Sequence, residues 1–347
     1  MIKYTELKAH NRQNLRDIIP LKKPFTLLIE PSNYCNFKCI QCFQSIQSKS
    51  YLTEHRGLME LSLYREVLRQ VRAWGTEKLK VLKLSLYGEP FTNPDFCEML
   101  RLAREADIAE RIETTTNASL LTQEVCKSLV EYEIDYVRVS VYASNQKRYE
   151  EVTSTQHANI DKIYQSLCRI QELKKQLGKD KPFVSAKMLD TYSAENDEFL
   201  NRFKNAADEV YIDKPHNWIA HEEKSFIGSL YGKEKEEALK EDLSHTMSER
   251  IACPMPFTTL AVRSNGDVSP CCVDWVGGTN LGNILETPIQ EIWNGETKYE
   301  FRKMQLENRR KENSSCGQCE LVSNDYYTRD NIDGFPVERL REGMKGQ

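Results

Sequence analysis

The sequence lacks the features of a membrane-spanning, secreted or nucleic-acid-binding protein. No apolar stretch approaches the roughly 18 residues that cross a bilayer, and residues 1–20 mix polar and charged residues with short apolar pairs. Lys and Arg total 48 against 52 Asp and Glu, for a formal net charge of −4, and no Lys/Arg block forms a track for a polyanion. We therefore expect a cytoplasmic protein with neither a membrane span nor a nucleic-acid partner.

The composition is equally far from that of a disordered or fibrous chain. Hydrophobic residues make up 39% and charged residues 29% of the 347 positions, which is enough to bury a core beneath a solvated surface. No internal repeat occurs at the periods of solenoid proteins. At about 150 residues per domain, the length suits one large domain with an appendage, or two ordinary domains.

Cysteine is the residue that the sequence has in abundance, with 11 in all. In a reducing cytoplasm such usage indicates metal or redox chemistry more than disulfide bonds. Three cysteines fall within eight residues near the N-terminus, and five lie between residues 253 and 319. The other three stand in helical patterns beside apolar residues and are predicted to pack in the core: Cys97, Cys126 and Cys168.

Short β-branched runs alternate with longer amphipathic stretches between residues 26 and 212, which is typical of βα units around a parallel sheet. Apolar residues at three- and four-residue steps predict helices over 61–74 and 160–177. Six strands are expected, at residues 26–30, 81–86, 112–116, 136–141, 183–188 and 209–212. Six units are two short of a closed barrel. We therefore predict an α/β fold, an open, partial (β/α)6 TIM-like barrel with its chemistry at the C-terminal ends of the strands.

Composition also divides the chain into five segments. They are an N-terminal extension at 1–23, the barrel at 24–218, a charged linker at 219–250, a small C-terminal unit at 251–322 and a polar tail at 323–347. The linker is interpreted as a solvated helix, because residues 233–242 are mostly Lys and Glu. Asn265 and Gly266 between two short runs predict a β-hairpin near the start of the C-terminal unit. The tail is expected either to be partly disordered or to fold back over the barrel.

Cys35, Cys39 and Cys42 form a C-x3-C-x2-C motif directly after the first predicted strand. Three thiolates on one loop can bind three irons of a cubane and leave the fourth iron open to another ligand. Zinc is the alternative, although a structural zinc site needs a fourth protein ligand from elsewhere. The motif resembles that of the radical S-adenosylmethionine (radical SAM) superfamily. The residue before the third cysteine, usually aromatic in that family, is Gln41 here.

The end of the second predicted strand resembles another motif of the same family. Tyr87, Gly88, Glu89 and Pro90 are similar to its Gly-Glu-Pro motif, which holds the amino group of S-adenosylmethionine. An ordinary turn is the alternative, because Gly and Pro commonly end strands.

The next strand ends carry further residues that the resemblance assigns to the cofactor. Asn117 lies in a turn similar to the family's Thr-Asn-Gly, with Ala118 in place of the glycine. Ser140 stands where the family often places a serine near the ribose, and a satisfied sheet hydroxyl explains it equally well. Lys187, after the fifth strand, joins these candidates.

Cys253, Cys271, Cys316 and Cys319 make a second set, and four thiolates form a fully protein-ligated site. Zinc is again the alternative. The pattern resembles the auxiliary-cluster domains of radical SAM enzymes, called SPASM and twitch, and in particular the two-cluster aminocyclitol dehydrogenases. Cys272 stays ambiguous: it is a substitute ligand for Cys271, a hydrogen-atom donor or a small packed side chain.

The resemblance implies two [4Fe-4S] clusters, S-adenosylmethionine, and a reducing partner such as flavodoxin or ferredoxin. In the family, cleavage of S-adenosylmethionine gives a 5′-deoxyadenosyl radical that takes a hydrogen atom from the substrate, and the protein orients and shields the reactants. The expected function is oxidation of a hydroxylated small molecule, namely a sugar, nucleotide-sugar or aminocyclitol. The auxiliary cluster would then accept an electron.

Three other functions stay open. They are a redox-neutral epimerase in which Cys272 returns a hydrogen, a maturase that modifies a peptide or protein, and a non-catalytic electron carrier. His216 is the candidate catalytic base because an imidazole titrates near neutral pH, although a histidine fixed by structural hydrogen bonds is equally compatible. Like His216, the residues Asp213, Lys214 and Trp218 follow the sixth predicted strand, and they are candidates for contact with the substrate.

Overall fold

The protein is built on one curved sheet of eight strands. A computed structural model describes residues 13–46, 55–156, 158–215, 226–244, 250–275, 277–317, 319–323 and 328–345. The strands run in the order β6-β5-β4-β3-β2-β1-β7-β8, and neighbours pair in parallel except β7 and β8. Their bounds are β1 Thr26–Ile29, β2 Val81–Leu84, β3 Ile112–Thr116, β4 Tyr136–Ser140, β5 Phe183–Leu189, β6 Glu209–Asp213, β7 Thr259–Val262 and β8 Val268–Ser269. The six predicted barrel strands and the open α/β barrel are confirmed, with strand ends shifted by at most two residues.

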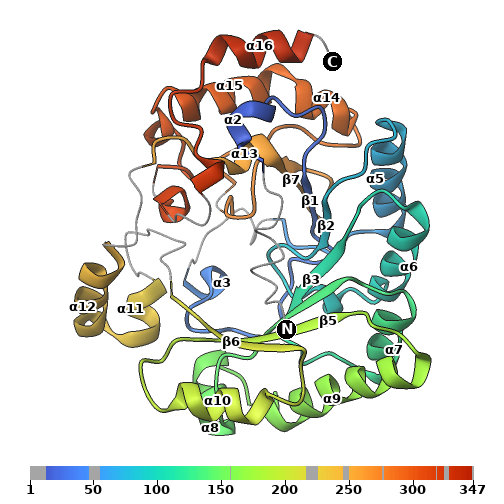
Figure 1. Ribbon diagram of the computed structural model, residues 1–347, viewed down its shortest axis with the longest axis vertical. Helices are drawn as coiled ribbons and strands as arrows, with labels where there is room; N and C mark the ends of the chain where they lie inside the picture. Colours follow the sequence, from blue (N-terminus) through green and yellow to red (C-terminus); the bar gives the residue numbers. More distant parts are fainter. Residues whose placement is uncertain are drawn as a thin grey trace.

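Helices cover one face of the sheet and both of its ends (Figure 1). Those that follow the barrel strands are α5 Leu61–Ala73, α6 Phe96–Ala106, α7 Gln123–Glu131, α8 Gln146–Thr153, α9 Ile160–Leu177 and α10 Glu195–Phe203. The remaining ones are α2 Leu15–Ile18, α3 Phe43–Ile46, α11 Phe226–Tyr231, α12 Lys233–Ser244, α13 Met255–Thr258, α14 Ile289–Asn294, α15 Glu296–Leu306 and α16 Val337–Lys345. The described residues also form short 3-10 helices at η1 Pro90–Thr92, η2 Arg310–Glu312, η3 Glu320–Ser323 and η4 Thr328–Asp330. No helix in these ranges is both long and apolar enough to cross a membrane.

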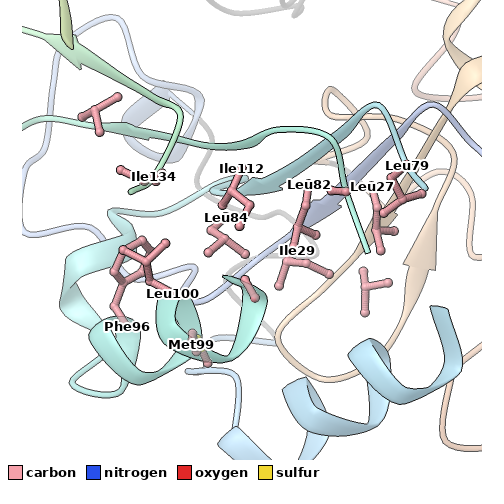
Figure 2. Packing of buried hydrophobic residues seen from close by; sticks show 14 of the residues in the cluster. Leu27, Ile29, Leu79, Leu82, Leu84, Phe96, Met99, Leu100, Ile112 and Ile134 are labelled. Atoms are coloured by element: carbon pink, nitrogen blue, oxygen red, sulfur yellow. The ribbon is translucent and has the colours of Figure 1, made fainter. Parts of the chain in front are cut away.

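The core lies between the sheet and its covering helices. Figure 2 shows Leu84 and Ile112 of the sheet close to Leu100 of α6, with Phe96 and Met99 on the same helix and Leu27 beside Leu79 further along the same layer. Side chains alternate along a strand, so the residues between them face the opposite side of the sheet. Burial of such an apolar layer supplies most of the free energy of folding.

The opposite, inner face of the sheet is largely polar. Its residues alternate with core residues on the same strands and stand outside the hydrophobic core cluster. The polar members within the strands include Lys83, Glu113, Thr115, Tyr136, Arg138, Ser140, Ser185, Lys187, Glu209, Tyr211 and Asp213. An open barrel with a polar inner face provides hydrogen-bonding groups for a polar ligand.

The predicted hairpin is confirmed, and it is part of the barrel sheet. β7 pairs in parallel with β1, from Thr26 opposite Thr259 to Ile29 opposite Val262. β8 pairs antiparallel with β7, and Gly266 in the turn has a φ of 90°. The C-terminal unit therefore begins as a continuation of the barrel, while the five-segment division of the chain stays a prediction.

The described part of the charged linker, residues 226–244, forms two helices that bury apolar side chains against the barrel, so the interpretation as one solvated helix is wrong for this part. Ile227 of α11 and Leu239 of α12 are buried together with Leu189 and Tyr231. The described part of the C-terminal tail also folds back: Arg341 of α16 pairs with Glu296 of α15 at 2.7 Å. Of the three cysteines predicted to pack in the core, Cys126 is buried and Cys97 and Cys168 are partly exposed.

Replacing Gly266 with Ala should lower the free energy of unfolding by about 1–2 kcal/mol, because a left-handed backbone strains any residue with a Cβ atom. The new Cβ would also lie 2.9 Å from Asn283 Oδ1. Anaerobic thermal unfolding measures the change. Gly57→Ala is the matched control, since its nearest neighbour would be Ser264 Oγ at 3.8 Å. Equal free energies of unfolding for the two variants would contradict the left-handed turn at Gly266.

Candidate active site

Cys35, Cys39 and Cys42 lie together on the loop that follows β1. The backbone N–H groups of Lys38 and Ile40 donate to carbonyls at the end of α8, at 3.2 and 2.9 Å. The Cys42 N–H donates to the Cys39 carbonyl at 3.0 Å, which curls the loop into a tight turn. The spacing of the cysteines and these backbone bonds therefore form one compact, anchored loop.

Burial governs the ionisation of these three thiols. It raises the pKa of Cys35 to about 12, and the negative charges of Glu89 and Cys42 nearby add to the shift. Burial likewise raises the pKa of Cys39 and of Cys42. Thiolates gathered in such a place need a bound cation to balance their charge, which fits iron ligation.

The turn after β2 presses against this loop at Gly88. A Cβ atom on Gly88 would lie 2.4 Å from the Tyr34 carbonyl oxygen and 2.5 Å from that of Ser32. The Glu89 N–H donates to the Tyr34 carbonyl at 2.8 Å. Glycine is thus required at this position by the close approach of two backbones.

The Glu89 carboxylate joins the ends of β2 and β3. It accepts hydrogen bonds from Thr116 Oγ1 at 2.7 Å and from the Asn117 N–H at 2.8 Å. The side chain is 3% exposed, and burial raises the pKa of its carboxyl to about 7. Its predicted contact with S-adenosylmethionine stays a prediction, alongside this structural role.

Asn117 turns toward the cysteine loop. Its Nδ2 donates to Asn36 Oδ1 at 3.0 Å and approaches Cys35 Sγ at 3.9 Å. Ala118, where the family has glycine, adopts a φ of 62°. The family's glycine preference at this turn thus has a conformational reason, and this chain accepts the strain.

The cysteine loop contains a buried amide, the Gln41 side chain, which borders a cavity. Gln41 is 3% exposed, and neither its Oε1 nor its Nε2 has a hydrogen-bond partner. It lines a cavity of about 280 Å³ with Tyr142, Arg148 and Lys235. An unpartnered buried amide is costly without a ligand. The orphaned amide and the adjoining cavity therefore fit a polar cofactor held against the cluster loop.

Ser140 and Lys187 both lie on the inner face, opposite one another in register. The Ser140 side chain lies near the Tyr142 hydroxyl and opposes the rise in the pKa of Tyr142 that burial causes. Lys187 Nζ donates to Asp213 Oδ2 at 2.5 Å. Among the sequence candidates after β6, His216 and Trp218 lie outside the described residues, so their roles stay predictions.

The second set of cysteines lines one apolar cavity. Cys253, Cys271, Cys316 and Cys319 all border it. Cys272 is not among the residues that border it, which favours Cys271 as the ligand. A cubane binds each of its four cysteines at a different iron, so a cavity bordered by four thiols fits such a cluster. In the described ranges no three His, Cys, Asp or Glu side chains are arranged to hold a single metal ion.

The two cysteine sites are linked by an aromatic cluster. Phe43, next to Cys42, stacks on Trp275 with ring centroids 4.7 Å apart and planes at 8°. Tyr87 meets the Phe43 ring edge-on at 5.7 Å. This contact fixes the loop of the first site against the loop of the second.

Sequence reasoning missed three features of the site. The Phe43–Trp275 stack left no local signal, because its partners are over 200 residues apart. Arg138 on the inner face could have been found, since a charged residue in the middle of a buried strand is unusual. The backbone contact that requires glycine at position 88 could not have been found from the sequence.

Comparison with known proteins agrees with this geometry. Residues 29–178 match the model of the radical SAM superfamily, and residues 253–320 match SPASM, an iron-sulfur cluster-binding domain. These matches indicate S-adenosylmethionine and two iron-sulfur clusters as cofactors.

Two curated proteins are similar in sequence. The S-adenosyl-L-methionine-dependent 2-deoxy-scyllo-inosamine dehydrogenase of Niallia circulans is 21% identical over 304 residues, or 87% of this chain and 96% of that protein. The tungsten-containing aldehyde ferredoxin oxidoreductase cofactor-modifying protein of Pyrococcus furiosus is 25% identical over 167 residues, or 48% of this chain. The chain spans 43% of the length of the latter.

Solved structures share the fold. Streptococcus suis SuiB bound to S-adenosylmethionine has a TM-score of 0.60 and 19% identity, over 92% of this chain and 77% of that one. BtrN in complex with AdoMet and 2-DOIA has a TM-score of 0.55 and 18% identity, over 88% of this chain and 98% of that one. At these identities the likeness concerns the fold alone.

Anaerobic reconstitution should load about eight irons per chain, as two cubanes of four. Replacing Cys35, Cys39 and Cys42 together with Ala should remove about half of the iron and abolish cleavage of S-adenosylmethionine. Iron analysis and detection of 5′-deoxyadenosine measure both effects. Cys97→Ala is the control and should retain full iron. Zinc at full occupancy in anaerobically prepared protein would contradict the assignment of the cysteines to iron-sulfur clusters.

The affinity for S-adenosylmethionine should fall as the pH is lowered from 8 to 6. The pKa of Glu89, raised to about 7 by burial, lies within this range, and only the ionised carboxylate attracts the cofactor's ammonium group. Glu89→Gln should weaken binding by about 10- to 150-fold and remove the pH dependence. Calorimetric titration of the reconstituted protein measures the dissociation constant. An unchanged constant at full iron content would refute this role of Glu89.

Proposed function

We propose that this chain, a radical SAM enzyme with a SPASM domain, oxidises the hydroxyl group of a small molecule to a ketone. A sugar, a nucleotide-sugar or an aminocyclitol fits the polar inner face of the barrel. Similarity to a 2-deoxy-scyllo-inosamine dehydrogenase over 96% of that protein's length supports a dehydrogenase reaction.

The position of Cys272 carries the proposal. It directly follows Cys271, a residue of the auxiliary cavity, yet the charges of Lys83 and Arg138, two residues of the barrel interior, act on it. Burial raises the pKa of its thiol, and the positive charges of Lys83 and Arg138 nearby oppose the shift. The auxiliary site therefore borders the inner face, where a substrate would lie.

The other end of the same face borders the first cysteine site. Burial raises the pKa of Tyr142 well above its ordinary value, and the charges of Cys39 and Cys42 nearby add to the shift. Its backbone has a φ of 72°, a strained conformation of the kind that gathers at functional sites. A substrate on the inner face thus has one cluster site at each end.

The reaction balances with these components. When bound, the first cluster and S-adenosylmethionine supply the radical that removes a hydrogen atom, and the auxiliary cluster supplies an acceptor for one electron. The substrate alcohol loses that hydrogen atom from carbon, a proton from oxygen and one electron, which together give the ketone.

The chain's own residues bind the substrate and take the proton. Inner-face hydroxyl and charged groups, Tyr211 and Ser185 among them, can hold substrate hydroxyls. Asp213, held by Lys187 at the end of β6, is a described candidate to receive the proton, and His216 is the sequence-based one. A cytoplasmic location and a flavodoxin- or ferredoxin-like reductant belong to the same proposal.

A redox-neutral epimerase is the second candidate, and the same cysteine favours it. A thiol that borders the inner face is placed to return a hydrogen atom to the opposite side of the reacting carbon. Iron ligation by Cys271 leaves the Cys272 thiol available for this role.

Mass spectrometry of the product formed in heavy water separates the two reactions. Oxidation should give a product two hydrogens lighter with no deuterium at the reacting carbon, and Cys272→Ala should retain turnover. Replacing Cys316 and Cys319 with Ala should block turnover. One deuterium at that carbon, with unchanged mass in light water and no turnover in Cys272→Ala, would establish the epimerase instead.

A further inference from the structure

We propose that helix α15 raises the reduction potential of the auxiliary cluster through the charge of Lys298 and a hydrogen bond from Gln305 to Cys316, which makes the cluster an electron acceptor. This inference rests on the proposed function, because the oxidation requires such an acceptor and the epimerase reaction does not. It gives a helix that carries no cysteine a part in the transfer of the substrate's electron.

α15 lies against the auxiliary cavity. Phe301 of this helix borders the cavity. Arg302 Nε donates to the carbonyl of Pro256, another residue that borders it, at 3.1 Å. Lys298, Arg302 and Gln305 stand at positions i, i+4 and i+7, which share one face of a helix. This face therefore brings polar side chains to the wall of the auxiliary site.

Gln305 contacts one of the cluster ligands directly. Its Nε2 donates to Cys316 Sγ at 3.4 Å, and its side chain is fully buried. Burial raises the pKa of Cys316 to about 11, and the hydrogen bond from Gln305 opposes the shift because it stabilises the thiolate. Hydrogen bonds to the sulfurs are among the factors that set the reduction potential of an iron-sulfur cluster.

Lys298 brings a buried positive charge to the same site. Its side chain is fully buried, and its Nζ donates to the Thr259 carbonyl at 3.4 Å. Burial lowers the pKa of Lys298 well below its ordinary value, and the charge of Arg302 adds to the shift. The charges of Cys271 and Cys253 oppose it, so both thiols lie near the ammonium group. An ammonium group in such a place is costly unless an anion is close, and the thiolates of the auxiliary site supply one.

Arg302 is a second buried cation on this face. Its guanidinium carbon lies 4.1 Å from the centroid of the Trp293 ring, and the side chain is 2% exposed. It donates to the Trp293 carbonyl at 3.3 Å, while its Nη2 is buried without a hydrogen-bond partner. Burial lowers the pKa of Arg302 to about 9, which leaves the group charged at neutral pH. Among the described residues, no carboxylate forms an ion pair with Arg302 or Lys298.

The other charges around the auxiliary cavity are of both signs. Asp274, a carboxylate that borders the cavity, pairs with Arg263 at 3.0 Å. Burial raises the pKa of Cys319, the positive charge of Arg310 opposes this shift and the negative charge of Glu320 adds to it. The two cations of α15 come in addition to these opposed charges.

Positive charge and N–H donors both favour the reduced form of a cluster. A cluster held by four thiolates is anionic, and reduction adds a further negative charge, which nearby cations and donors stabilise. The potential therefore rises, and transfer of an electron from the substrate radical becomes more favourable. This is the property that the proposed oxidation requires of the auxiliary cluster.

Redox titration of the reconstituted holoenzyme, followed by electron paramagnetic resonance, measures the potential of the auxiliary cluster. Added S-adenosylmethionine changes the spectrum of the first cluster, which separates the two signals. Lys298→Met should lower the potential by about 59 mV or more, which is a tenfold change in the equilibrium constant for one electron. Gln305→Leu should also lower it, and Lys298→Arg should keep it near the wild-type value. Lys303→Met, which removes a partly exposed lysine from the same helix, is the matched control and should leave the potential unchanged.

Iron content equal to that of the wild type establishes that a variant carries both clusters. An unchanged potential in Lys298→Met at full iron content would overturn the proposal and leave Lys298 with a structural role. If Lys298→Met loses iron, Gln305→Leu decides, because it leaves every charge in place: a lowered potential supports the proposal and an unchanged one refutes it.

The proposed function is tested separately, because the potential is measured without substrate. A ketone product together with unchanged potentials in the variants would refute the role of α15 and leave the oxidation standing. A deuterated product of unchanged oxidation state, together with a lowered potential in Lys298→Met, would refute the oxidation and support the effect of α15 on the cluster.

Discussion

The close backbone contact at Gly88 holds the first site together. There the turn after β2 lies against the carbonyls of Ser32 and Tyr34, too close for any side chain, and so supports the loop that carries Cys35. Glu89 extends the contact to the end of β3 through Thr116 and the Asn117 N–H. Three strand ends are thereby fixed around the three cysteines. Rigid placement of this kind is what a reactive cofactor requires of a protein.

The second site depends on the first through the sheet and the aromatic cluster. Pairing of β7 with β1 brings the segment that ends in Cys271 and Cys272 to the edge of the barrel. Arg263 then pairs with Asp274 at 3.0 Å, with both side chains almost fully buried. Such a pair costs desolvation energy and is weak evidence for stability. It does fix the loop beside Trp275, which stacks on Phe43.

Strand alternation gives the sheet two separate tasks. On β4, Val137 and Val139 supply the buried apolar surface that stabilises the fold. Arg138 and Ser140, on the other face, present polar groups to the barrel interior. A charged residue is tolerated in the middle of this strand because the inner face of the sheet is polar. The stability of the sheet and the chemistry of its interior are therefore set by alternate residues of the same strands.

Sequence alone determined what depends on neighbours along the chain. The spacing of Cys35, Cys39 and Cys42, the hairpin at Gly266 and the strand at 112–116 follow from local pattern, because thiol spacing, backbone preference and side-chain alternation act over a few residues. Only the tertiary structure decided that β7 extends the barrel, that Cys271 rather than Cys272 borders the auxiliary cavity, and that Glu89 binds the end of β3. Those contacts join segments tens to hundreds of residues apart. Their partners are selected by the packing of the whole chain, which leaves no periodic signal in either segment.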